Sequence, residues 1–308
     1  MRKFLRAIIG PLVVLGVLQR TFSFLMPTEH HHRHSSTTTT TTSTTFYSSH
    51  SPFEKRSPPY VCLITETNAC DSPELLDSTL TYLKKAVATN LVDLISVRVA
   101  PLEDPKLYHR QEANIISLVQ QLKSCSTQRG SNFSVVLSSD WRHLAKSSGA
   151  DGVHFKESHR PYIPSLRTEL PNLLVGTSTH TIESAIEAYK EYQPDYFFAG
   201  TCYLTASHPE KDQNDLEGPQ FPGQVKESIE KECGQIIPVI AIGGIDEQNC
   251  HEPIAFGASG VAAIRAVSQA NDAEQAVRRI QNKMEASMLA MKESESSSRA
   301  EHKDISLE

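Results

Sequence analysis

The stretch "IPVIAIGGIDEQNCHEPIAFGASGVAAIRAV", residues 237–267, contains two short apolar runs separated by a polar segment. The first run stops at Gly243-Gly244, and the second begins at Gly260. A strand that only filled a core would gain nothing from two glycines at its end. Because glycine lacks a Cβ atom, it lets a backbone approach another group closely and leaves amide N–H groups unobstructed. We therefore interpret the stretch as two consecutive β-then-α units with a close backbone approach at the strand ends.

The same alternation of short apolar runs and amphipathic segments extends back to Tyr60. The segments after Ser72 and after His180 carry apolar residues at helical spacing. Eight such units in about 225 residues favour a single (β/α)8 TIM barrel over an open doubly wound sheet, and the chain has no GxGxxG motif. The eight apolar runs are residues 60–65, 91–99, 133–138, 152–155, 173–178, 195–200, 237–243 and 260–264.

In such a barrel the carboxyl ends of the strands carry the functional groups. The loops after the seventh and eighth strands are a common phosphate site, in which glycine amides face the anion. Gly243, Gly244 and Gly260 are therefore candidate phosphate-binding residues. The alternative is that these glycines only allow the chain to turn.

Composition narrows the function classes. The 308 residues carry a formal net charge of −6, which argues against a general nucleic-acid binder. The six cysteines form no CxxC pair and no metal-ligand spacing, so they are interpreted as thiols in a reducing compartment. A hydrophobic content of 39% indicates that part of the chain lies outside a folded core.

The amino-terminal region differs from the rest. Residues 1–27 have a basic start and an apolar run, Ala7–Leu18, which has signal-peptide length and is too short for a stable membrane span. Residues 28–57 are a Ser/Thr/His-rich segment of transit-like or linker character. Together they resemble a two-part plastid presequence, and the alternatives are secretion or an endomembrane location. The barrel is then expected over residues 58–290, followed by a flexible tail over 291–308.

Six motifs carry a family resemblance. In order they are "LIT" (63–65), "GADGVHF" (149–155), "GTSTH" (176–180), "DYFFAGTCYLTASHP" (195–209), "PVIAIGGI" (238–245) and "GASGVAAIRAV" (257–267). In this order and spacing they resemble thiamine-phosphate synthase and its TenI relatives, over roughly residues 60–284. The resemblance implies a TIM barrel of thiamine biosynthesis. It also implies thiazole-phosphate binding at Gly243, Gly244, Gly260, Ile264 and Arg265.

Synthases of this family join an aminopyrimidine diphosphate to the thiazole phosphate, and the departing diphosphate requires positive charge and Mg²⁺. The resemblance implies Arg98 and His208 as catalytic residues. It implies Asp140 as the Mg²⁺ ligand, although Asp140 would also suit the N-cap of a helix starting at Trp141. The remaining substrate-binding candidates are Ser139, His154, Ser178, Thr205 and Ser207. The position of His154 suits a substrate contact or an acid/base role, and a hydrogen-bonded structural role is equally open.

Several family positions are changed here. The lysine expected after Arg98 is Ala100, the second aspartate is replaced near Ser158 or His159, and His208 stands for another lysine. We therefore expect a diphosphate site poor in positive charge, unless Lys211 reaches it. The TenI-type alternative, isomerisation of the thiazole, lacks its histidine because Thr201 follows Gly200. A non-catalytic regulatory member, an enzyme on another phosphorylated substrate, and a homo-oligomer also stay open.

Overall fold

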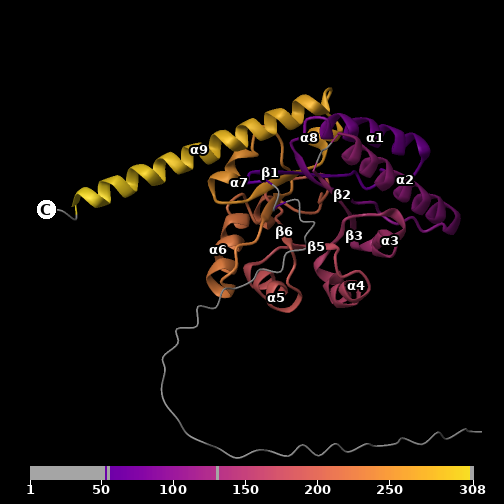
Figure 1. The fold of residues 1–308 in the computed structure, drawn as a ribbon, viewed down its shortest axis with the longest axis horizontal. Helices are drawn as coiled ribbons and strands as arrows, with labels where there is room; N and C mark the ends of the chain where they lie inside the picture. Colours follow the sequence, from indigo (N-terminus) through magenta and orange to yellow (C-terminus); the bar gives the residue numbers. More distant parts are fainter. Residues whose placement is uncertain (1–52, 54–55, 130–131, 306–308) are drawn as a thin grey trace, which may run out of the picture. The chain divides into compact units, whose positions relative to one another are not determined.

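The eight predicted strands form one closed parallel barrel in the part of the chain that the structure describes (Figure 1). The structure is a computed structural model and describes residues 53, 56–129 and 132–305, all within one unit, Thr45–Glu308. Each strand pairs in parallel with the next, and β8 pairs with β1. The strands are β1 (Tyr60–Ile64), β2 (Val92–Val97), β3 (Ser134–Ser138), β4 (Gly152–Phe155), β5 (Leu174–Thr179), β6 (Tyr196–Ala199), β7 (Val239–Ile242) and β8 (Gly260–Ala263).

Helices occupy the intervals between the strands. Ser72 accepts a hydrogen bond from the Leu75 amide and caps α1, and Thr181 caps α5 through the Ser184 amide, as expected for hydroxyl residues at N-caps. The helices are α1 (Pro73–Val87), α2 (Pro105–Arg129), η2 (Ser139–Leu144), α3 (Ala145–Ser148), η3 (Glu157–Tyr162), α4 (Ile163–Glu169), α5 (Ile182–Tyr192), η4 (Gln213–Asp215), α6 (Phe221–Cys233), α7 (His251–Ala255), α8 (Arg265–Ser268) and α9 (Ala273–Ile305).

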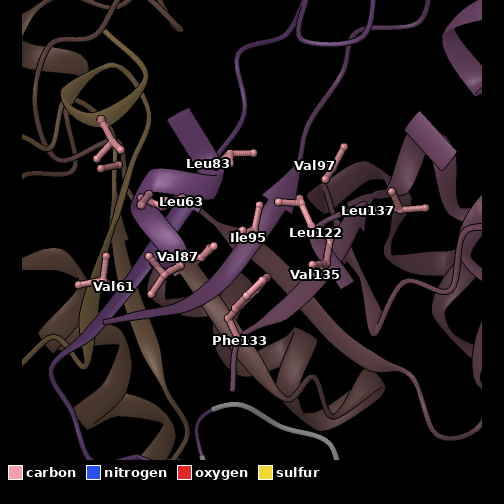
Figure 2. Close-up of a cluster of buried hydrophobic side chains, with 14 of the residues drawn as sticks. Val61, Leu63, Leu83, Val87, Ile95, Val97, Leu122, Phe133, Val135 and Leu137 are labelled. Atoms are coloured by element: carbon pink, nitrogen blue, oxygen red, sulfur yellow. The ribbon is translucent and has the colours of Figure 1, made fainter. Parts of the chain in front are cut away.

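Alternate residues of each strand face two different apolar layers. Val61 and Leu63 of β1 point outward toward Leu83 and Val87 of α1, in the cluster drawn in Figure 2. Their neighbours Cys62 and Ile64 point into the barrel, where they join Tyr196 and Phe198. Each fully buried aliphatic side chain of this kind contributes about 1.5–3 kcal/mol. The strands are thus buried on both faces, which explains their nearly continuous apolar sequence.

The amino-terminal end of the barrel is filled by aromatic side chains. Phe53 is buried, its ring lies 4.8 Å from that of Tyr60 and 5.3 Å from that of Tyr196, and its carbonyl accepts a hydrogen bond from the Tyr60 hydroxyl. Arg56 donates to Asp93 at 3.2 Å. Packing on the barrel therefore extends to Phe53, before the predicted boundary at residue 58, although β1 itself begins at Tyr60. The polar composition around Phe53 and Arg56 gave no sign in the sequence that these two residues pack on the barrel.

The buried Asp93 carboxylate depends on this amino-terminal segment. Burial raises the pKa of Asp93 to about 6, while the Arg56 guanidinium and the Val61 amide act in the opposite direction. The Val61 amide donates to Asp93 at 2.8 Å, so the carboxylate also holds β1 beside β2. The folded part of the chain therefore includes the residues immediately before β1.

Helix α9 differs from its expected boundary. The flexible tail predicted from residue 291 is helical in its described part, because α9 continues without interruption to Ile305. The first half of α9 packs on α1, α7 and α8 and buries Met284, and the helix then runs on past the barrel (Figure 1). Within the described ranges, no helix has the length and apolar character needed to cross a bilayer. The predicted signal segment and nearly all of the transit-like segment lie outside the described residues.

Candidate functional site

A cavity of about 750 Å³ opens at the carboxyl ends of the strands. Its floor is apolar and includes Ile64, Phe198, Ile242 and Ala262. The rest of the lining is polar and contains both basic residues and two acidic residues, Glu157 and Asp246. A cavity with an apolar body and a few convergent polar groups is typical of a small-molecule site. The predicted site residues that line it are Arg98, His154, Ser178, Thr205, Ser207, His208, Gly243, Gly244, Ile264 and Arg265.

The paired glycines after β7 bring two loops into close contact. Gly243 and Gly244 have φ angles of 99° and 65°, which favour glycine. A Cβ atom on Gly244 would lie 2.6 Å from the Leu204 carbonyl oxygen, and one on Gly243 would lie 2.6 Å from Cγ2 of Thr201. The backbone therefore approaches the loop after β6 as well as the cavity. The glycines hold that loop against the floor of the site.

Gly260 lies elsewhere. It is the first residue of β8 and pairs with Tyr60 at the amino-terminal end of the barrel. A Cβ atom there would lie 2.3 Å from the Tyr60 carbonyl oxygen, so glycine is required for strand packing. The expected phosphate contact of Gly260 is corrected accordingly, because a four-residue strand separates it from the carboxyl end, where Ile264 and Arg265 line the cavity.

Two arginines from distant parts of the chain meet above the loop after β6. Arg265 donates to the Thr205 hydroxyl at 3.0 Å and lies 3.5 Å from the Ser207 hydroxyl. Arg98, which follows β2, lies 3.5 Å from the same Ser207 oxygen. Arginine presents several donors in a planar fork that suits phosphate oxygens. These two guanidinium groups and two hydroxyls form a cluster, here called the arginine pair, that can bind an anion.

The arginine pair keeps unused hydrogen-bonding capacity. Burial lowers the pKa of Arg98, Glu66 opposes that change and the nearby Arg265 adds to it. The guanidinium still stays charged at neutral pH. Buried Nε of Arg98 and buried Oγ of Ser138, both on cavity-lining residues, have no hydrogen-bond partner among the described residues. Unsatisfied buried polar atoms are costly in a folded protein, and a ligand that binds them would remove that cost.

His154 is a neutral hydrogen-bonding residue in this site. Its Nδ1 lies 3.1 Å from the Tyr196 hydroxyl, its Nε2 lies 2.9 Å from the Ser178 hydroxyl, and its ring packs 4.3 Å from that of Phe198. Burial lowers the pKa of His154 to about 3. The structure favours a histidine that orients Ser178 at the cavity wall over an acid/base group, because an imidazole with a pKa of about 3 is a weak base at neutral pH.

Ser139 is buried and is not among the cavity-lining residues. Its hydroxyl lies 2.8 Å from Nδ1 of His159 and accepts a hydrogen bond from the Lys156 amide at 3.3 Å. The expected substrate contact of Ser139 is therefore replaced by a positioning role, since this hydroxyl joins the exits of β3 and β4. The neighbouring Ser138 is the residue that faces the cavity.

Asp140 is not the helix N-cap that the sequence offered as one alternative. It lies inside η2, whose N-cap is Ser138, so it does not cap a helix at Trp141. Its carboxylate pairs with Nζ of Lys156 at 2.7 Å and lies 4.0 Å from Nδ1 of His159. Mg²⁺ requires several oxygen ligands, including one or two carboxylates. Within the described residues no group of three His, Cys, Asp or Glu side chains is arranged to hold a metal ion. The residues present do not fit the magnesium site implied by the resemblance.

The loop after β6 contains two residues, His208 and Lys211, that could supply the positive charge missing from the family pattern. Neither contributes much charge to the cavity. His208 lines the cavity but its ring is half-exposed and contacts Glu210 at 2.9 Å. Lys211 is bound to Glu217 at 2.9 Å and is not a lining residue. Glu217 also accepts a hydrogen bond from the Thr201 amide and lies 3.3 Å from His180. Burial raises the pKa of Glu217, but these hydrogen bonds outweigh it and the net direction is downward.

Sequence reasoning missed several cavity-lining polar residues, among them Ser138, Lys156 and His180. Each stands at or just beyond the carboxyl end of a strand, on β3, after β4 and after β5. That position was the available signal, because barrel chemistry collects there. Cys202, in the same loop region, is buried, and burial raises the pKa of its thiol to about 12, which argues against a nucleophilic role.

Comparisons with known proteins agree with this geometry. Residues 61–267 match the thiamine monophosphate synthase family. The thiamine-phosphate synthase of Chlorobium limicola is 30% identical over 224 residues, which cover 73% of this chain and 93% of that protein. The thiamine-phosphate synthase of Gloeobacter violaceus is 30% identical over 62% of this chain, but the chain spans only 53% of that relative's length.

Among solved structures, a thiamine phosphate pyrophosphorylase from Pyrococcus furiosus superposes with a TM-score of 0.57. It is 22% identical and covers 74% of this chain and 96% of its own, which supports the barrel fold. The family match spans all eight strands, from the second residue of β1 to the end of β8 and beyond. This chain therefore belongs to the thiamine monophosphate synthase family.

Proposed function

We propose that this chain joins an aminopyrimidine diphosphate to a thiazole phosphate and releases pyrophosphate. The observation that carries the proposal is the arginine pair, in which Arg98 and Arg265 approach the same Ser207 hydroxyl beside the cavity. Two permanent cations at one place are costly unless an anion binds between them. A diphosphate supplies that anion.

The chemistry needs little proton transfer. The bond between the pyrimidine methylene carbon and the diphosphate oxygen breaks, and both electrons leave with the diphosphate. The thiazole nitrogen then supplies its lone pair to the methylene carbon, forming the new C–N bond. Preorganised cations stabilise the negative charge that develops on the leaving group, and this is the largest contribution that such a site can make.

The other cavity residues suit the two ring systems. Phe198 and the neutral pair His154–Ser178 offer an apolar face and a hydroxyl for the pyrimidine. The loop of Gly243 and Gly244 lies beside β8 and its exit, where a second phosphate fits the expected thiazole-phosphate position. The neutral state of His154 is useful here, because a charged imidazole would repel a cation-like pyrimidine methylene.

The test is formation of thiamine phosphate by the purified full chain, supplied with both substrates, in magnesium and separately in EDTA. Product in either condition, lost in Arg98→Ala, supports the proposal. Tight binding of the thiazole phosphate with no coupling would instead identify a regulatory member. Isomerisation of a thiazole carboxylate phosphate without coupling would identify a TenI-type activity, with His180 and Glu217 as the groups to examine.

A second part of the proposal concerns location and assembly, and it rests on the sequence alone. Residues 1–57 direct the chain to a plastid, with secretion and endomembrane retention as the alternative outcomes. A fluorescent protein fused behind these residues tests the targeting, and a plastid signal supports it. Self-association and the lack of nucleic-acid binding also stay predictions, which sedimentation of the pure protein with and without RNA would check.

A further inference from the structure

The ion pair between Lys156 and Asp140 occupies the position where the family resemblance places a divalent cation. We propose that the Lys156 ammonium replaces that cation, so that this barrel binds its diphosphate substrate without Mg²⁺. This inference rests on the proposed function, because it names the third positive group of the diphosphate site. Lys156 was not among the residues that the sequence motifs suggested.

The local structure holds Lys156 at the cavity edge. Lys156 directly follows β4 and lines the cavity. Its amide donates to the Ser139 hydroxyl at 3.3 Å, and its Nζ lies 2.7 Å from Oδ2 of Asp140. The Asp140 side chain is only 16% exposed, whereas that of Lys156 is 54% exposed. The carboxylate is thus the fixed partner, and it anchors a lysine head group that reaches the open side.

The Lys156 ammonium has hydrogen-bond donors left over with which it can bind a ligand. A lysine ammonium has three donors, and Asp140 uses one of them at the distance observed. The others are available to phosphate oxygens. Together with Arg98 and Arg265, both on the cavity lining, Lys156 provides a third cation for a diphosphate. Under this proposal Lys156 offsets part of the shortage of positive charge that the sequence predicts for the site.

The same contacts work against a metal ion. A dication at the Asp140 carboxylate would have to displace Lys156 and would repel it while both stayed close. The second carboxylate that Mg²⁺ would use is replaced by Ser158 or His159, and Nδ1 of His159 lies 2.8 Å from the Ser139 hydroxyl. Mg²⁺ held by one carboxylate relies on substrate phosphates and water for its remaining ligands. The ammonium of Lys156 is covalently part of the chain and therefore needs no such additional ligands.

The substitution Asp140→Asn separates the two interpretations by the sign of its effect. If Asp140 is a metal ligand, its loss weakens magnesium-dependent binding. If Lys156 is the cation, loss of the neighbouring negative charge leaves a stronger field for an anion, so binding tightens. If the Lys156–Asp140 pair is only a surface salt bridge with no ligand role, the affinity for the anion should not change in either direction. Exposed ion pairs contribute only about 0–1 kcal/mol to stability.

The experiment is titration of the full chain with inorganic pyrophosphate by calorimetry, in EDTA and in excess Mg²⁺. Wild type is expected to bind in EDTA. Lys156→Gln is expected to weaken that binding by about tenfold or more, the size of one charge-assisted hydrogen bond. Asp140→Asn is expected to bind more tightly than wild type. Lys231→Gln, which removes an exposed lysine from the last turn of α6, is the matched charge control and is expected to leave binding unchanged.

Two results would overturn the inference. One is wild-type binding that appears only with Mg²⁺ and is lost in Asp140→Asn, and this result would leave the proposed function standing. The other is equal binding by wild type and Lys156→Gln in EDTA. Absence of pyrophosphate binding in both buffers would remove the proposed function together with this inference. Thermal melts of each variant establish that the comparison is made between folded proteins.

Discussion

Arg265 donates to the Thr205 hydroxyl at 3.0 Å, which ties the exit of β8 to the loop after β6. This contact places a cation from the expected thiazole-phosphate side next to Arg98 on the expected diphosphate side. The two phosphate subsites are therefore neighbours that share one basic cluster. The predictions below test that cluster, the glycine loop, the buried histidine and the amino-terminal boundary.

Removing either member of the arginine pair should impair coupling strongly. Arg98→Ala and Arg265→Ala should each lower kcat/KM by about 10- to 150-fold, the equivalent of 1.5–3 kcal/mol for a hydrogen bond to a charged group. Because both groups bind one anion, the double variant should lose less than the product of the single losses. Arg278→Ala, which removes an exposed arginine of α9 paired with Glu274, is the control. Losses no larger than the control would show that the pair has no ligand role.

Adding the two lysines that the family pattern expects should change little. Ala100 is outside the cavity lining and its carbonyl accepts a hydrogen bond from Gln111, and His208 is engaged with Glu210. Ala100→Lys combined with His208→Lys should therefore raise synthase activity by less than about fivefold, the scale of an exposed ion pair. A gain of two orders of magnitude in the steady-state rate would restore the interpretation of a charge-deficient site.

Gly244 and Gly234 form a matched pair for testing the loop contact. Their φ angles are 65° and 66°, but a Cβ atom on Gly234 meets nothing within 4 Å, whereas one on Gly244 meets the Leu204 carbonyl oxygen at 2.6 Å. Gly234→Ala should cost about 1 kcal/mol of stability from backbone strain alone. Gly244→Ala should cost more and should also weaken pyrophosphate binding, because Leu204 precedes Thr205. Urea melts and titrations measure both, and equal behaviour of the two variants would contradict the loop contact.

The buried His154 should make the protein sensitive to acid. Its pKa is lowered to about 3 in the folded state, so the unfolded chain takes up a proton first as the pH falls below about 6.5. Stability linked to this group is therefore complete above that pH and is lost as the pH falls toward 3. Asp93, whose pKa is raised to about 6, has the opposite sign because the folded state binds its proton more readily.

A comparison with His154→Gln isolates the histidine. Between pH 6.5 and pH 5 the wild type should lose about 1.6 kcal/mol of unfolding free energy relative to the variant, and the contribution of Asp93 cancels in the difference. Denaturant unfolding at several pH values provides the measurement. A difference between the two proteins that stays constant with pH would mean that His154 titrates normally in the folded state.

The amino-terminal boundary can be tested by truncation. A chain beginning at residue 57 lacks Phe53 and Arg56, so the barrel end loses its aromatic filling and Asp93 loses its cation. It should be less stable than a chain beginning at residue 52 by about 3–5 kcal/mol, the usual cost of removing a buried phenylalanine. Phe53→Ala in the full chain should reproduce most of that loss. Identical thermal melts of the two truncated chains would place the boundary after residue 56.

Much of this protein follows from the sequence by itself. The alternation of apolar runs with helical segments was sufficient for the barrel, because each run is long enough for one strand and its two buried faces leave a nearly continuous apolar pattern. Strand ends are local features as well. Gly243 and Gly244 were identified from their position at the end of such a run, and both line the cavity. Arg98, Ser178, Thr205, Ser207 and Arg265 were implied by the family resemblance of the motifs, and they line the cavity as well.

The tertiary structure decided which of these groups meet. The contact of Arg98 with Ser207, the pairing of Lys156 with Asp140, and the separation of Gly260 from the cavity depend on the register and closure of the barrel. Phe53 gains its burial from Tyr60 and Tyr196, which no local pattern relates to it. Periodicity along the chain reflects which face of an element is buried. The partner of a side chain is set by how distant elements pack, and that information lies in three-dimensional geometry rather than in local spacing.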